Sequence, residues 1–452
     1  MITSISLRNF RAFQENITIR MRPVTVLIGR NSAGKSSVIK FLLMLKQTLE
    51  SQGDSFFVTE GRDVQLGTWK DLRHTNTRHG SAVDKYLRFS IEVVTDDLPS
   101  AEIQEMWKIV STGAAVRAHG DTIKVHMEFP RQPLRRESPQ GRFVIDGNVL
   151  YAAKFKVGRH EVSGFFDEDE VFRKATGNLE TSGFLRFSKR TDSVSKVVEA
   201  IAGEPFLEAL RYEFISQRHL SPVREESQQV IQTGSPPPGY VGHKGEYAMP
   251  HLVRILANPE KEDKANLILQ FAAQVARVEK LKFRSEVARL LSDVRGTNMD
   301  TGAMCLLADF GFGVSQCLPI FVQGAMHDRH QLLIVEQPEA QLHPTAQLEL
   351  GSYFAELWLR HEVPSLIETH SANVLLRLRK LVRQGVLQPQ DVSVAYFTVE
   401  QVKRKGGVVF PAVVVKNLDI NADGSLTKGL PIEFFGADVL EALDMEGSSE
   451  QQ

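Results

Sequence analysis

Hydrophobic positions recur with two different periods along the chain, and the changes of period indicate how it is organised. Near the N-terminus, Ile2 to Leu7 and Ile17 to Ile19 look like strands of an antiparallel hairpin. The apolar run Val24 to Ile28 predicts a buried strand, and Val38 to Leu49 has helical spacing. The start of the chain therefore predicts a hairpin, a buried strand and a helix, in that order.

The middle of the chain changes from β-type to helical spacing. Residues 86–189 contain mostly short β segments with polar connectors, whereas 194–211 and 262–295 have apolar residues three or four positions apart, as helices do. A long loop with the proline-rich segment Pro236 to Gly239 separates the two predicted helices. A structureless stretch of that length is unusual in a compact domain and is often functional.

An α/β pattern returns after Gly311. It predicts strands at 331–335, 365–368, 392–399 and 408–415, and helices at 314–323 and 344–360. No internal repeat is visible in the sequence. The pattern is that of one α/β core whose two halves are separated in the sequence by a large insertion.

Bulk composition narrows the function classes only a little. The chain has 452 residues, of which 42% are hydrophobic and 24% charged, as in ordinary globular proteins. Its net charge of −1 gives no overall attraction to nucleic acids or membranes. The only cysteines, Cys305 and Cys317, form no C-x-x-C motif. Because the sequence also has no signal-peptide pattern and no apolar run near the roughly 20 residues that span a bilayer, we expect a cytoplasmic protein.

The segment after the first buried strand carries the phosphate-loop motif G-x-x-x-x-G-K-[ST] between a strand and a helix, as this motif requires. Its residues are Gly29, Arg30, Asn31, Ser32, Ala33, Gly34, Lys35 and Ser36. Backbone N–H groups of such a loop wrap a phosphate, and the helix N-terminus adds a favourable dipole. Lys35 would reach the β- and γ-phosphates, and the Ser36 hydroxyl would coordinate Mg²⁺. The expected ligand is a nucleoside triphosphate.

Later segments supply the rest of a nucleotide site. The apolar strand that ends at Glu336 places a carboxylate where parallel sheets hold Mg²⁺, and His370 follows the next buried strand. Gly311 to Gln316 precedes a helix and is either an ordinary glycine turn or a phosphate-binding helix start. Because the chain already has its own phosphate loop, the second reading implies a nucleotide that belongs to another subunit.

Together these motifs resemble those of the ABC/SMC-type ATPases, and in particular the RecF-like and OLD-like branch. The segments that carry the resemblance are Asn9 to Phe13, Gly29 to Ser37, Gly311 to Pro319, Glu336 to Pro344 and Glu368 to Ser371. Val335 to Pro344, with a C-terminal stretch that contains Leu418, Asp419 and Glu433 to Phe435, is similar to ATPase subunits of bacterial phage-defence systems such as Septu and PARIS. The resemblance covers both ends of the chain and hardly extends to residues 80–210.

The fold class that follows is α/β, with an ABC/SMC-like P-loop ATPase core split by a large insertion that is β-rich and then helical. We expect the N-terminal half of the core at 1–80 and its C-terminal half at 301–445. The insertion at 81–300 would form a lid, an arm or a partner-binding part, and residues 446–452 a disordered tail.

The resemblance also implies roles for individual residues around the phosphates. Lys35 and Ser36 hold the phosphates and Mg²⁺ of bound ATP, and Ser37 and Asn31 support them. Glu336 takes the place of the usual magnesium-binding aspartate.

Further roles implied by the resemblance involve the attacking water and the second subunit. Gln65 is either the glutamine that senses Mg²⁺ and the water or an ordinary loop residue. Gly313, Val314 and Ser315 are the signature segment that touches the γ-phosphate across a dimer, and His370 is the switch histidine.

One position departs from the family pattern. Where such ATPases carry a catalytic glutamate after the magnesium-binding acid, this chain has Gln337. An amide can orient water but cannot accept its proton. Hydrolysis is then slow, or Glu339 substitutes as the base, or the alignment is shifted by one residue. We favour slow hydrolysis, with Lys35, Glu336, Gln337 and His370 as the catalytic set.

The predicted function is an ATPase whose ATP-dependent homodimer, or higher oligomer, acts as a switch for a separately encoded toxin or nuclease in antiphage defence. The alternative is a RecF/SMC-like clamp on DNA, which makes nucleic acid a further candidate partner; no membrane partner is expected. Only residues 371–452 follow the switch histidine, which is short for an OLD-type nuclease domain. We therefore expect no nuclease within this chain.

Overall fold

The computed structural model describes most of both ends of the chain. The described residues are 1–51, 58–72, 74, 87–94, short strands between 122 and 188, 212–286, 291–403, 407 and 409–427. The helix predicted at 194–211, the Glu433 to Phe435 segment and the tail at 446–452 lie outside them.

A six-stranded sheet with the order β12-β17-β18-β3-β19-β20 forms the centre of the fold. Its strands are β12 (Arg218–Leu220), β17 (Leu333–Glu336), β18 (Ser365–Glu368), β3 (Val24–Gly29), β19 (Val392–Lys403) and β20 (Val409–Leu418). The first five are parallel to one another, and β20 pairs antiparallel with β19. The predicted α/β core is therefore confirmed, and the phosphate-loop strand β3 lies inside it.

The residues of β3 are all buried because the sheet is covered on both faces. Val24, Val26 and Ile28 belong to one hydrophobic core, and Leu27 points into the other. This two-sided burial explains why the strand is read in the sequence as an unbroken apolar run rather than as an alternating one.

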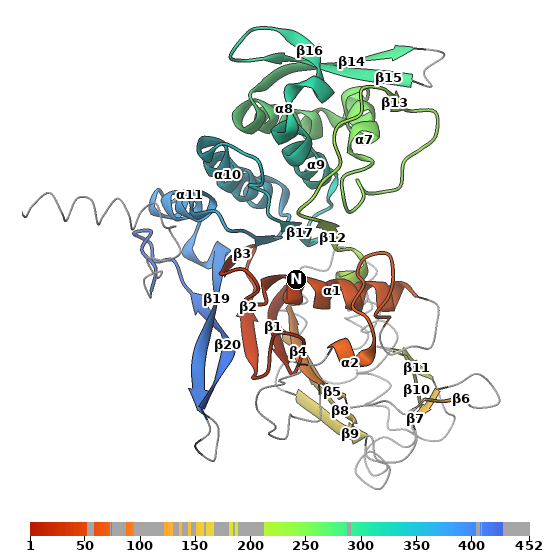
Figure 1. Ribbon diagram of the computed structural model, residues 1–452, viewed down its shortest axis with the longest axis vertical. Coiled ribbons are helices and arrows are strands. Elements are labelled where there is room, and N and C mark those ends of the chain that lie inside the picture. The colour runs from red at the N-terminus through yellow and green to blue at the C-terminus, as the bar shows by residue number, and fades with distance from the viewer. Residues whose placement is uncertain are drawn as a thin grey trace, which may run out of the picture.

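Helices form the first core, above the sheet in Figure 1. They are α7 (Ala248–Leu256), α8 (Glu262–Ala276), α9 (Phe312–Met326), α10 (Pro344–His361) and α11 (Ala372–Arg383). Tyr353 of α10 is fully buried at their centre, with its ring between Phe271 and Phe321 and its hydroxyl donating to the Ile320 carbonyl at 2.9 Å. The helices predicted at 314–323 and 344–360 are thus confirmed.

The N-terminal hairpin and the helix that follows the phosphate loop cover the opposite face of the central sheet (Figure 1). Helix α1 (Lys35–Glu50) packs there together with the antiparallel hairpin of β1 (Ile2–Arg8) and β2 (Ile17–Arg20). The Asn417 side chain joins this hairpin to β20, because its amide donates to the Thr18 carbonyl at 2.8 Å and accepts from the Arg20 N–H at 2.9 Å.

The β-rich part of the predicted insertion continues the N-terminal hairpin as one antiparallel sheet, β2-β1-β4-β5-β8-β9. The added strands are β4 (Leu87–Val94), β5 (Thr122–Phe129), β8 (Tyr151–Val157) and β9 (His160–Phe166). Two further pairs are β6 (Arg135–Glu137) with β7 (Phe143–Ile145), and β10 (Glu180–Gly183) with β11 (Arg186–Ser188). The sheet therefore crosses the expected boundary at residue 80.

The helix predicted at 262–295 is wrong beyond Ala276, where α8 ends. The chain continues as strand β14 (Val278–Glu286), whose register with its neighbour shifts between Glu279 and Lys282. Such a bulge turns two residues three positions apart to the same face. Val278 and Leu281 are both buried for this reason, and their spacing imitates a helix in the sequence.

The long loop predicted between residues 211 and 262 also needs correction, since it contains β12, β13 and α7. Strand β13 (Ile231–Gln232) joins β14, β15 (Leu291–Asn298) and β16 (Met304–Leu306) in a small sheet beside α8. The described residues also contain the short helix α2 (Trp69–Leu72) and 3₁₀ turns at Pro259–Lys261, Leu307–Phe310 and Pro389–Asp391. Of the helices in the described ranges, none is long and apolar enough to cross a membrane.

The pH dependence of the free energy of unfolding should reveal the burial of His327, at the end of α9. Burial lowers the pKa of His327 from 6.5 to about 4. Between these values the unfolded chain binds a proton that the folded chain does not, so the free energy of unfolding falls as the pH drops through this window, by up to about 1.4 kcal/mol per pH unit. We expect His327→Gln to flatten this dependence in denaturant titrations at pH 7 and pH 5. An unchanged slope would contradict the assignment.

Candidate functional site

The phosphate loop connects β3 to α1 with two glycines in conformations that other residues rarely adopt. Gly29 has a φ of 140° and Gly34, the N-cap of α1, a φ of 96°. A Cβ atom on Gly29 would lie 2.3 Å from the Phe397 carbonyl oxygen of β19. The loop therefore depends on glycine at its first and sixth positions. Arg30, Asn31 and Ser32 between them are exposed.

Lys35 lies at the inside of the loop, with only 3% of its surface exposed. Its Nζ donates to the carbonyl oxygens of Gly29 and Arg30, both at 2.9 Å. Burial lowers the pKa of the Lys35 amine, while the nearby Glu368 and Glu339 act in the opposite direction. The amine is thus placed within the loop, where a phosphate-loop lysine meets its phosphates.

Three oxygen-bearing side chains meet beside the loop. The Ser36 hydroxyl donates to Glu368 Oε1 at 2.9 Å, and Glu368 is paired directly with Glu336 in the β17–β18 register. Burial, followed by the charge of Glu336, raises the pKa of Glu368 to about 7. Sequence reasoning gave Glu368 no role, although it ends a buried parallel strand in the same way as Glu336.

This donor set fits Mg²⁺. Hydroxyl and carboxylate oxygens are the ligands it prefers, usually completed by phosphate and water oxygens. Glu368 Oε2 is buried without a hydrogen-bond partner among the described residues, and a cation would satisfy it. In the part of the chain that the structure describes, no cluster of three or more His, Cys, Asp and Glu could hold a metal alone. That finding is compatible with a magnesium site in which the nucleotide supplies ligands.

The residues after Glu336 fold back onto the end of β18. Gln337 has a φ of 45°, and its N–H donates to the Glu368 carbonyl at 2.7 Å. The buried Glu339 accepts the His370 N–H on its Oε1 at 2.7 Å, and burial raises the pKa of its carboxyl group. His370 is an exposed residue, but partial burial of its ring, followed by the charge of Lys35, lowers its pKa. Glu336, Gln337 and His370 thus gather around the phosphate loop.

Gln65 lies in a segment, 58–67, that α1 holds in place. The Gln47 side chain of α1 accepts from the Val64 N–H at 3.1 Å and donates to the Val64 carbonyl at 3.2 Å. Gln65 itself is exposed and forms a β-bridge with Glu60. The helix that begins at the phosphate loop therefore fixes the backbone on which Gln65 is carried.

The predicted signature segment is at the start of α9, where Gly311 and Phe312 are exposed and Val314 and Ser315 are buried. The Ser315 hydroxyl donates to Ser227 Oγ at 3.1 Å and accepts the Ser227 N–H at 3.0 Å. The structure thus engages Ser315 with its own chain.

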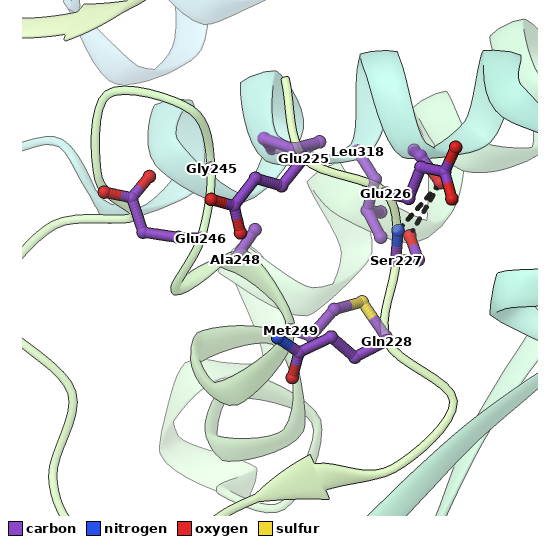
Figure 2. Close-up of a pocket in the computed structure, with 11 residues that line it drawn as sticks. Glu225, Glu226, Ser227, Gln228, Gly245, Glu246, Ala248, Met249 and Leu318 are labelled. Carbon is purple, nitrogen blue, oxygen red and sulfur yellow. Dashed lines mark hydrogen bonds between the residues drawn. The ribbon is translucent and has the colours of Figure 1, made fainter.

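A pocket lies beside this helix start, between the segment 225–228 and the turn before α7 (Figure 2). Glu225, Glu226 and Glu246 contribute to its lining, as does Ser315. Three carboxylates make the pocket unfavourable for phosphate. An anion would therefore reach α9 more favourably at the exposed Gly311 and Phe312 than from the pocket side.

Arg224 connects the start of α9 to the magnesium-binding edge of the sheet. Its buried guanidinium donates from Nη2 to the Glu336 carbonyl at 2.7 Å, and burial lowers its pKa to about 10. The Gln316 side chain of α9 bonds both backbone groups of Arg224, the N–H at 3.4 Å and the carbonyl at 3.1 Å.

A line of polar side chains continues from Glu336 away from the phosphate loop. His219 Nε2 is 2.7 Å from Glu336 Oε1, and the Nδ1 atoms of His219 and His243 are 3.2 Å apart. His243 Nε2 lies 2.7 Å from Asp63 Oδ1, and Lys46 Nζ lies 3.1 Å from Asp63 Oδ2. Burial would raise the pKa of Asp63, but the contacts with His243 and Lys46 outweigh it and lower the pKa to about 2. The sequence gave no sign of this line, because its members are far apart along the chain.

Comparison with known protein families supports an ATPase. Residues 1–128 match the family described as an AAA ATPase domain, and this range includes the phosphate loop. No curated protein matches the chain. The match and the phosphate loop agree on a P-loop ATPase, whereas the phage-defence branch remains a prediction.

The solved structures that the chain is similar to include SMC head domains. One, bound to the C-winged helix domain of ScpA, has a TM-score of 0.44 at 10% identity and covers 93% of this chain and 98% of its own. The SMC head domain from Thermotoga maritima has a TM-score of 0.38 at 10% identity, with 91% and 98% covered. A head domain with an extended coiled coil, bound to the C-terminal domain of ScpA derived from Pyrococcus furiosus, has 0.43 at 8%, with 99% of both chains covered. Similarity this low carries no argument about function.

The connection through Gln316 should contribute measurably to stability. Gln316→Ala leaves the buried N–H and carbonyl of Arg224 without partners, which typically costs about 1–3 kcal/mol. Gln229→Ala is the matched control, since Gln229 is exposed and surface changes of this kind usually stay within about 0.5 kcal/mol. Urea denaturation of both variants provides the measurement. Equal losses in the two would show that Gln316 makes no special contribution.

Proposed function

We propose that this chain binds ATP with Mg²⁺ at the phosphate loop, hydrolyses it slowly, and uses the bound state to form a pair of subunits. The observation that carries the proposal is the meeting of Lys35, Ser36 and two strand-end glutamates at one edge of a parallel sheet. In α/β folds, ligands bind at this carboxyl edge.

The residues of the chain would divide the work as follows. Backbone N–H groups of the loop and the Lys35 amine hold the β- and γ-phosphates, and Ser36 and Glu336 hold the cation. Bound Mg²⁺ neutralises charge on the phosphate oxygens. His370, exposed beside Lys35, is positioned to contact the γ-phosphate. Gln65 would approach the cation and the water from the segment fixed by Gln47.

Slow hydrolysis is expected because Gln337 stands at the position where related ATPases carry a catalytic glutamate. Gln337 cannot accept a proton, and loss of a general base typically costs about 10²–10⁴ in rate. Glu339 is a poor substitute, because one of its oxygens accepts the His370 N–H and the residue is buried. A site of this kind would hold ATP longer than it consumes it.

The pair of subunits would place each phosphate loop against the Gly313 helix start of the other copy, in closed two-fold symmetry. ATP then stabilises the pair by mass action. Control of a separately encoded toxin or nuclease in antiphage defence is the finer part of the proposal, and it rests on the family resemblance alone.

Removal of the Lys35 amine tests nucleotide binding. We expect Lys35→Ala to lose ATP binding in calorimetry with Mg²⁺, because the β- and γ-phosphates lose their charge partner. Lys261→Ala, which removes an exposed lysine of a 3₁₀ turn, is the control and should bind as the wild type does. Retained binding in Lys35→Ala would refute the site.

Light scattering on the same proteins tests the pair. ATP should double the particle mass of the wild type and leave that of Lys35→Ala unchanged. A constant mass, combined with ATP-dependent DNA binding that weakens steeply with salt, would instead favour the clamp.

Turnover tests the role of Gln337. We expect Gln337→Glu to raise the steady-state hydrolysis rate, by at most about 10²–10⁴, because it restores a proton acceptor. Glu339→Gln in the wild-type background is the companion variant and should leave the slow rate nearly unchanged. If Gln337→Glu is no faster and Glu339→Gln is inactive, Glu339 is the base.

A further inference from the structure

The two histidines between Glu336 and Asp63 have no role in the reaction described above, yet the direction of their hydrogen bonds to the carboxylates follows from chemistry. Carboxylate oxygens only accept, so the Nε2 atoms that face Glu336 and Asp63 both donate. The two Nδ1 atoms face each other at 3.2 Å, a distance at which a hydrogen bond needs one proton between them.

His219 is held on two sides: it is 7% exposed and lies between Glu336 and His243. His243 in turn lies between His219 and Asp63. Whichever ring carries the proton between the two Nδ1 atoms, Nε2 of His219 donates to Glu336 and Nε2 of His243 donates to Asp63. The line of hydrogen bonds therefore ends with a donor at Glu336 Oε1.

The line connects segments that are distant in the sequence. Glu336 is on β17, His219 on the neighbouring β12, and His243 in the turn before α7. Asp63 lies two residues before Gln65 and is anchored by Lys46 of α1. The carboxylate at the sheet edge and the Gln65 segment are thus held by one set of hydrogen bonds.

We propose that His219 and His243 are positioning residues, which fix the orientation of the Glu336 carboxylate for Mg²⁺ and tie it to the segment that carries Gln65. The bond to Oε1 restricts rotation of the carboxylate and leaves Oε2 for the cation. Groups that orient metal ligands in this way usually matter for metal affinity, and their loss costs roughly 10–100-fold. The inference rests on the proposed function, namely that this site binds ATP with Mg²⁺.

Two substitutions at one position separate orientation from packing. In His219→Gln the amide nitrogen falls near the place of Nε2 and keeps a donor for Glu336. In His219→Asn the shorter side chain replaces Nδ1, so it keeps a partner for His243 but no longer reaches Glu336. We expect His219→Asn to raise the Mg²⁺ concentration for half-maximal MgATP binding roughly 10–100-fold, and His219→Gln to stay near the wild type.

ATP binding measured in excess EDTA distinguishes the positioning role from a merely structural one, because a structural defect would weaken this binding as well. It should be equal in the wild type and both variants, because Lys35 and the loop N–H groups act without the cation. If His219→Asn weakens both kinds of binding equally, or neither, the positioning role is wrong. If the wild type shows no Mg²⁺-dependent ATP binding, the proposed function fails instead, and the two failures are distinguishable.

At the Asp63 end of the line, two substitutions of His243 form a second matched pair. His243→Asn keeps a group at the Nδ1 position for His219 and loses Asp63, whereas His243→Gln does the reverse. We expect His243→Gln to have the larger effect on Mg²⁺ dependence, because it breaks the bond nearer to Glu336. Stoichiometric zinc in the purified wild type that is lost in His243→Gln would overturn the proposal, since the two facing nitrogens would then be metal ligands.

Discussion

Parallel pairing of β17, β18 and β3 is the constraint on which the site depends. The register sets Glu336 beside Glu368 and Glu368 beside Leu27, so both carboxylates lie next to the strand that leads into the phosphate loop. In a parallel sheet the carboxyl ends of neighbouring strands share one edge. Segments more than 300 residues apart in the sequence are thereby brought to a single place, and a shift of register by one residue would turn these side chains to the opposite face.

The negative charges at that edge are balanced mainly by cationic side chains of the same chain. Glu336, Glu339 and Glu368 face two buried or nearly buried cations, Lys35 and Arg224. Burial of charge is costly unless it is paired, and Oε2 of both Glu339 and Glu368 is buried without a hydrogen-bond partner among the described residues. An arrangement of this kind is understandable at a place built to receive a cation together with phosphates, whose charges complement those already present.

The sequence predicted the parts of the fold that local patterns specify. Unbroken apolar runs predicted β3, β17 and β18, and the loop motif identified Lys35 and Ser36. Each of these signals lies within a few consecutive residues. The prediction from apolar spacing was wrong at β14, because the bulge gives this strand the spacing of a helix. The line from Glu336 to Asp63 could not be predicted, because His219 and His243 make contacts 117 and 180 residues away. Nothing in a local pattern distinguishes them from surface histidines.

The side chain of Asn417 has a consequence for how copies of this chain can meet. By donating to Thr18 and accepting from Arg20, its amide imitates the N–H and C=O of one residue in a neighbouring strand. An unpaired strand edge invites another chain to add to it. Here these two groups of the β2 edge are already occupied by an amide that cannot extend into a further strand. A strand from another molecule therefore cannot pair with Thr18 and Arg20 while Asn417 holds them.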